Sequence, residues 1–172
     1  MRIFNKHSLF LIMAGIISSA GIKASIVTLN ITGNVVASPC QISSDSVAKS
    51  VDLGQDIQAS ALQTAGSASG WVKFDINLEN CPAGTTLATM TMHGTPDSSG
   101  PDDLYRNTGT AGNVAVQLQM QSGEGMGDSR MYTGTIASNT YTYRMQARAY
   151  TASGSVTPGT ISSVVTATFT YQ

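Results

Sequence analysis

Residues 159–172 read GTISSVVTATFTYQ, and this stretch decides the fold. Ile161, Val165, Ala167, Phe169 and Tyr171 recur at even spacing, with mostly hydroxylated residues between them. Because successive side chains of a β-strand point to opposite faces, this period of two predicts a half-buried strand. The run stops where the sequence stops, so no later segment is present to pair with the second edge of this strand.

The same period recurs upstream. Alternating runs cover 72–79, 87–93, 114–120 and 141–149, and shorter candidates lie near 35–42 and 51–53. Turn residues separate the runs at 81–84, 94–113, 122–128 and 153–159, and the small, polar stretch 59–70 is expected to be a loop. Many short strands with turn signals between them predict an all-β, antiparallel sandwich of immunoglobulin type, built as one domain.

A further alternating run stands near the N-terminus. Its apolar face consists of Val27, Leu29, Ile31, Gly33 and Val35, and polar residues fill the positions between them. One interpretation is an edge strand of the chain's own sandwich. The other follows from the unpaired last strand. A sandwich that lacks one strand exposes an apolar groove and a row of unpaired N–H and C=O groups, which the N-terminal strand of another copy would fill.

The first residues are expected to be removed from the mature protein. Arg2 and Lys6 give a basic start, and a short apolar run precedes Lys23 and Ala24. This pattern is typical of a secretory signal peptide over 1–24, with a second small-residue cleavage site after Ala20 as an alternative. The apolar run is shorter than the ~20 residues of a membrane span, which disfavours an anchor. The mature chain would have six Lys/Arg and ten Asp/Glu, a net charge of −4.

The mature chain contains two cysteines, Cys40 and Cys81, and an exported chain with an even cysteine count predicts a disulfide between them. His93 is the only histidine after the leader, so neither a metal site nor a Ser-His-Asp arrangement has support. With 11% charged residues and no basic patch, nucleic-acid binding is also unsupported. We therefore expect no enzyme, no metal, no cofactor and no small-molecule substrate.

Several motifs resemble one family when taken in order. They are VTLNITGNVVA at 27–37 with Pro39-Cys40 after it, VDLG at 51–54, NCPAG at 80–84, and a terminal run with Gly159 fourteenth from the end and Tyr171 second to last. The chain resembles the subunits of chaperone–usher fimbriae, and most of all the minor adaptor subunits of type 1 fimbriae. The resemblance covers the whole mature chain.

This resemblance implies a division into a signal peptide at 1–24, a donor-strand extension at 25–37 and a pilin domain at 38–172. It implies an incomplete immunoglobulin-like sandwich that lacks its last strand and is completed in trans by donor-strand complementation. The donor face would be Val27, Leu29, Ile31, Gly33 and Val35. The acceptor groove, which would also bind the chaperone, would be lined by Gly159, Ile161, Val165, Ala167, Phe169, Tyr171 and Gln172.

The implied partners are neighbouring fimbrial subunits, with an adhesin on one side, a periplasmic pilus chaperone and an outer-membrane usher. The implied location is the cell-surface fimbrium, where the chain would support adhesion as a tip adaptor. Two alternatives stay open: a major rod subunit, and a self-contained secreted binding module whose N-terminal strand pairs within its own sheet. A periplasmic hydrolase has no catalytic constellation to support it.

Overall fold

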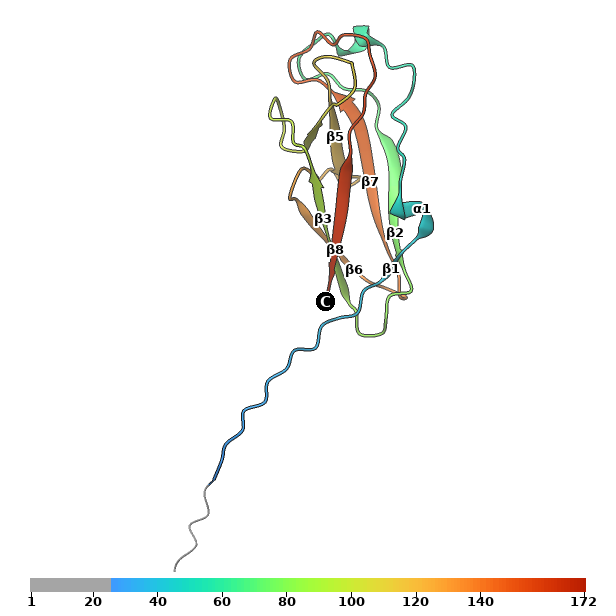
Figure 1. Cartoon of the computed structure of the whole chain (residues 1–172). Helices are drawn as coiled ribbons and strands as arrows, with labels where there is room; N and C mark the ends of the chain where they lie inside the picture. Colours follow the sequence, from blue (N-terminus) through green and yellow to red (C-terminus); the bar gives the residue numbers. More distant parts are fainter. Residues whose placement is uncertain (1–25) are drawn as a thin grey trace, which may run out of the picture. The chain divides into compact units, whose positions relative to one another are not determined.

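A computed structural model describes residues 26–172 (Figure 1). The chain divides into two compact units, Met1–Asn34 and Val35–Gln172, and the sandwich belongs to the second. The expected signal peptide at 1–24 lies outside the described residues. Among the residues described, no helix is long and apolar enough to span a bilayer.

The larger sheet has five strands in the order β1-β2-β7-β5-β4, and every neighbouring pair is antiparallel. Their bounds are β1 Gln41–Ile42, β2 Val72–Glu79, β4 Leu104–Arg106, β5 Ala115–Met120 and β7 Tyr141–Tyr150. The central strand β7 pairs with β2 on one side and with β5 on the other. The apolar face of each alternating run therefore meets the core, as the sequence period predicts.

The smaller sheet has three antiparallel strands in the order β6-β3-β8. Their bounds are β3 Leu87–Gly94, β6 Met131–Thr135 and β8 Val165–Tyr171. β3 is the middle strand, and Figure 1 shows β8 beside it. Among the described residues β8 therefore has a partner on one edge only.

The core lies between the two sheets. Met90 and Met92 of β3 are buried against Tyr143 and Met145 of β7 in one cluster. The Tyr143 hydroxyl donates a hydrogen bond to the carbonyl of Ala88, 2.7 Å away, so a buried polar group is satisfied across the sandwich. The fold is thus an incomplete immunoglobulin-like sandwich, as expected from the sequence.

Some sequence expectations were wrong in detail. The terminal strand begins at Val165 instead of near residue 160, and of the candidate at 35–42 only Gln41–Ile42 is a strand. Residues 51–53 form no strand. The expected loop at 59–70 contains a 3-10 helix, η1 (Ala59–Leu62), which buries Leu62. β4, β6 and the short helix α1 (Ser44–Val47) were not predicted.

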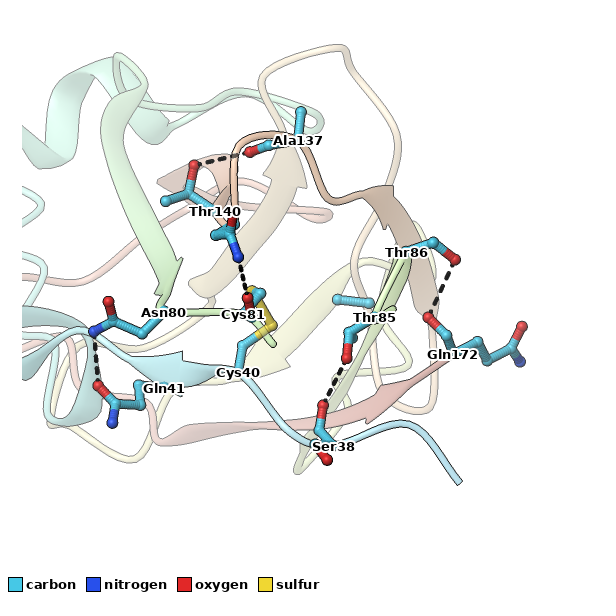
Figure 2. The surroundings of a disulfide bond; sticks show 12 residues. Ser38, Cys40, Gln41, Asn80, Cys81, Thr85, Thr86, Ala137, Thr140 and Gln172 are labelled. Carbon is cyan, nitrogen blue, oxygen red and sulfur yellow. Dashed lines mark hydrogen bonds between the residues drawn. A yellow bond between two sulfur atoms is a disulfide. The ribbon is translucent and has the colours of Figure 1, made fainter. Parts of the chain in front are cut away.

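The predicted disulfide is present between Cys40 and Cys81 (Figure 2). It joins residues 41 positions apart, and closing a loop of that size stabilises the folded state by about 4 kcal/mol in the chain-entropy view. It lies at the end of β2, next to β1. The Asn139 side chain donates to the Cys81 carbonyl at 2.6 Å, so hydrogen bonding also holds this corner.

Candidate strand-acceptor groove

The inward face of β8 is only half covered. Val165, Ala167, Phe169 and Tyr171 are all part-exposed, and the threonines between them are exposed. Phe169 packs against Tyr143, with ring centroids 5.7 Å apart, so this face does reach the core. Apolar side chains that face a core and stay part-exposed indicate that a neighbouring element is absent.

The free edge of β8 has a definite hydrogen-bonding pattern. Leu87 and Gln172 exchange both backbone hydrogen bonds, at 2.9 and 3.0 Å. In an antiparallel pair, hydrogen-bonded positions alternate with positions whose N–H and C=O point away. The register therefore directs the backbone groups of Val165, Ala167, Phe169 and Tyr171 away from β3. The residues that present apolar side chains to the core therefore also present backbone groups that have no partner among the described residues.

A cleft of about 1400 Å³ runs along this edge, within the unit Val35–Gln172. Residues of four other strands form its floor: Phe74, Ile76, Met92, Val116, Leu118 and Ala147. Val51, Leu53 and Ile57 line it from the segment between α1 and η1. The cleft is thus a groove with an apolar floor and with β8 as one wall.

The start of the groove is held by the loop at 107–112. The Thr108 N–H donates to the Ser162 carbonyl at 2.8 Å, and the Ala111 N–H donates to the Thr160 carbonyl at 3.0 Å. A Cβ on Gly159 would lie 2.6 Å from the carbonyl carbon of Thr110, so only glycine permits this close backbone approach. The wall is therefore preformed before β8 begins.

The C-terminal end of β8 is fixed beside the residues that precede β3 (Figure 2). The Gln172 carbonyl oxygen accepts hydrogen bonds from the N–H groups of Thr86, at 2.6 Å, and Leu87, at 2.9 Å. The neighbouring Thr85 hydroxyl donates to the Ser38 carbonyl at 3.0 Å. The C-terminus and the residues just before Cys40 are therefore anchored at the same end of the domain.

The residues that the sequence predicts as the donor strand are exposed and extended without a strand partner in the described chain. Residues 26–40 contain no strand. Val27, Leu29, Ile31 and Val35 are 76–100% exposed, and nothing lies within 4 Å of a Cβ placed on Gly33. A continuous series of exposed apolar side chains is unfavourable in water.

The groove residues named from the sequence are mostly brought together. Gly159, Ile161, Val165, Ala167 and Phe169 line the cleft. Tyr171 packs against the same core beyond the cleft, and Gln172 follows it at the chain end. Sequence reasoning did not assign the floor and the opposite wall, because alternation marks a residue as inward-facing without showing whether another strand covers it.

Two titratable side chains near the groove have shifted pKa values. Burial raises the pKa of the Tyr171 hydroxyl, so this phenol stays neutral at physiological pH. At the rim, the Gly54 N–H holds the pKa of the Asp52 carboxyl below its usual range. In the described part of the chain, no three His, Cys, Asp or Glu side chains gather where they could hold a metal.

Comparisons with known proteins agree with this geometry. Residues 29–172 match the family described as "Fimbrial protein". Protein FimG of Escherichia coli (strain K12) is 38% identical over 91% of both chains. Among solved structures, the P pilus rod subunit PapA is 27% identical with a TM-score of 0.66, over 78% of this chain and all of that one. A chaperone–usher pilus subunit is 25% identical with a TM-score of 0.66, over 90% of this chain and all of its own.

These relatives form surface pili, so export to the cell-surface fimbrium follows. The chain belongs to the fimbrial protein family and is a subunit of chaperone–usher pili.

Proposed function

We propose that the chain polymerises by donor-strand exchange as a non-enzymatic structural subunit. Its residues 25–37 insert into the groove of one neighbour, and its own groove receives the corresponding strand of the other. The observation that carries the proposal is the free edge of β8, where apolar side chains and unpaired backbone groups belong to the same residues.

The two surfaces match in chemistry. The extension offers Val27, Leu29, Ile31 and Val35 on one face, and the groove is apolar along its floor. Burying four such side chains contributes about 6–10 kcal/mol before the cost of ordering the extension. A strand added to an open edge also gains backbone hydrogen bonds, which is the principle of β-augmentation.

The position of Ser38 favours a donor from another molecule. Ser38 is anchored beside the C-terminal end of β8, so the chain's own extension could enter its own groove directly only by running parallel to β8. A strand from a second molecule is free to run antiparallel, which is the slightly more stable pairing. The geometry therefore supports exchange between subunits over self-insertion.

In this proposal a periplasmic chaperone covers the β8 edge and binds the terminal carboxylate of Gln172 until the usher brings the next subunit. The role we propose is a tip adaptor, because the stretches 51–84 and 107–116 resemble those of minor adaptor subunits. The alternative is a rod subunit, which the similarity to PapA favours.

The test compares three mature proteins that begin at Ser25: the unchanged chain, a chain lacking residues 25–36, and a chain with a copy of those residues linked after Gln172. The linked copy can fold back antiparallel to β8. We expect the third form to be a monomer with a far higher melting temperature. We expect the second to be folded but only weakly stable, and to gain stability with added donor peptide or chaperone. A truncated chain that is a stable, cooperative monomer by itself would overturn the proposal and favour a self-contained binding module.

The position of the chain along the fibre distinguishes a tip adaptor from a rod subunit. Gold-labelled antibody against this chain is expected at one end of each fibre if the chain is a tip adaptor. Labelling along the whole shaft would assign the rod role instead.

A further inference from the structure

The cations of the described chain are unevenly placed. Residues 26–172 contain six Lys/Arg, of which Lys49 pairs with Asp45 and Arg130 with Asp102. The other four have no ion pair within this part of the chain. They all lie on the five-stranded sheet and alternate with its core residues, so they project from its outer face: Lys73 on β2, Arg106 on β4, and Arg144 and Arg148 on β7.

Arg148 differs from the other three cations because its side chain is fixed. Its guanidinium lies over the Trp71 ring, 4.1 Å from the ring centroid, and 6.0 Å from the centroid of Tyr150. Its Nε donates a hydrogen bond to the Gln117 side-chain oxygen at 2.7 Å. Stacking and a hydrogen bond together set both the position and the plane of the guanidinium.

Gln117 is in turn oriented by a buried carboxylate. Its Nε2 lies 3.0 Å from each carboxylate oxygen of Asp103, and the Gln119 Nε2 donates to Asp103 at 2.7 Å. Asp103 and Gln117 are only 3% and 4% exposed. Because the anion attracts the amide N–H groups, the amide oxygen of Gln117 must face Arg148. The arginine is therefore supported by a chain of polar contacts that reaches into the sheet.

This arrangement leaves a preorganised fork on the surface. Within the described chain no acceptor is bonded to the Nη1 and Nη2 nitrogens of Arg148. A planar guanidinium with free N–H groups fits a carboxylate bidentately. Tryptophan, tyrosine and arginine are also the residues that most often dominate protein–protein binding energy. A side chain held this firmly loses little conformational entropy on binding.

The acidic residues of the chain show what fits this face. Of ten Asp/Glu, Asp75 and Glu79 lie on β2 and Asp103 is buried in the turn before β4. The other seven lie in α1 or in loops and are not buried: Asp45, Asp52, Asp56, Asp97, Asp102, Glu124 and Asp128. On the outer face Asp75 lies opposite Arg144, whereas Gln117 lies opposite Arg148. The fixed guanidinium of Arg148 and the acidic loops are therefore complementary between two copies or between related subunits. Contacts between unlike surfaces are heterologous, and they propagate along a fibre instead of closing a dimer.

We propose that this face, centred on Trp71 and Arg148, docks a carboxylate from an acidic loop of a neighbouring fimbrial subunit. This lateral contact is distinct from strand exchange. Phe74 and Ile76 of β2 face the groove, whereas Lys73 projects from the opposite side of the same sheet, so both surfaces can be occupied at once.

The test uses assembled fibres that contain the full mature chain. Arg148→Lys places an amine at the proposed contact, and carbodiimide joins an amine to a carboxylate only when the two touch. Arg144→Lys is the matched control, because Arg144 lies on the same face of β7, exposed and without a stacking partner. After cross-linking, the fibres are boiled in denaturant, and covalently linked pairs of subunits are measured by mass. We expect Arg148→Lys fibres to give on the order of tenfold more of this product than the control, because one hot-spot arginine changes binding by about that factor. Mass spectrometry should identify an Asp or Glu of the neighbour in the linkage.

Equal or absent two-subunit product in both variants, in intact fibres, would overturn the lateral contact and leave strand exchange untouched. A second outcome would also overturn the proposal: no cross-link forms, but fibres bind to hyaluronan beads and lose this binding with Arg148→Ala. The face would then bind an acidic sugar. If even the unchanged chain forms no fibres, the proposed function is contradicted, and not the lateral contact alone.

Discussion

Strands β7 and β8 carry the same alternating pattern but have different surroundings. β7 (Tyr141–Tyr150) has a partner on both edges, and its core-facing residues Tyr143, Met145 and Ala149 are fully buried. β8 (Val165–Tyr171) has a partner on one edge, and its core-facing residues stay part-exposed. This difference is what the proposed strand exchange requires, because the apolar pattern of β8 fits a neighbouring strand that the described residues do not supply within the sandwich.

The largest difference between the strands should appear in amide hydrogen exchange. Without a donor, the amides of Ala167, Phe169 and Tyr171 have no partner, whereas those of Thr166 and Thr168 bond to β3. We expect exchange at the threonines to be about a hundredfold slower or more. Their amide hydrogen bonds must break before exchange, and this opening costs a few kcal/mol. Donor peptide 25–37 should then protect both sets, as measured by NMR. Equal protection along β8 without donor would mean that its second edge is already paired.

The loss of stability on truncating a core side chain should depend on the donor for β8 but not for β7. Met145→Ala on β7 removes a fully buried side chain and should cost about 2–5 kcal/mol of unfolding free energy with or without donor. Phe169→Ala on β8 should cost much less without donor, because its side chain is only part-buried, and should approach that range with donor bound. Denaturant unfolding with and without peptide 25–37 measures both. A donor-independent cost at Phe169 would contradict the open-groove account.

Adding a side chain at Gly159, where two backbone segments lie close together, should disturb β8 and leave β7 intact. Gly159→Ala would force the segment before β8 away from Thr110, and overpacking of this kind costs about 1–3 kcal/mol. The measurement is donor-peptide affinity, which should fall because the groove wall moves. Gly70→Ala is the matched control, since nothing lies within 4 Å of its added Cβ. Equal affinity for both variants would show that the 107–112 loop does not hold the groove.

The smallest effect concerns two tyrosines. Burial raises the pKa of Tyr143, so the folded state favours its neutral form. Its stabilising contribution is fully present below pH of about 10 and is lost as the pH rises further. Tyr143→Phe should cost about 1 kcal/mol at pH 8 through the lost hydrogen bond to Ala88, and should reduce alkaline destabilisation.

Tyr171→Phe is the counterpart on β8. The pKa of Tyr171 is also raised by burial, but its side chain is only part-buried, so its effect on melting temperature without donor should be smaller. A larger effect at Tyr171 than at Tyr143 would contradict the difference in burial between the two strands.

Much of the sandwich was predictable from the sequence, because a period of two marks both the strand and its inward face. β2, β3 and β7 appear where the alternation places them. β4 and β6 were missed because Leu104–Arg106 and Met131–Thr135 are short and flanked by turn residues, and their pairing depends on partners far along the chain.

The groove was predictable only in part. One wall follows from the terminal run, but Val51, Leu53 and Ile57 form no strand, and only the fold brings them opposite β8. The polar support of Arg148 had no signal in the sequence either. Asp103, Gln117 and Trp71 come from three separate segments, and only strand register places them together.

The central claim is that the groove binds the strand formed by residues 25–37. Calorimetric titration of that peptide into a chain lacking residues 25–37 tests it most directly, with a control peptide in which each apolar residue exchanges place with its polar neighbour. The account predicts one peptide bound per chain, a large rise in melting temperature, and no binding of the control, because a one-residue shift turns every side chain to the opposite face. Equal binding of both peptides, or a truncated chain that is fully stable without either, would contradict it.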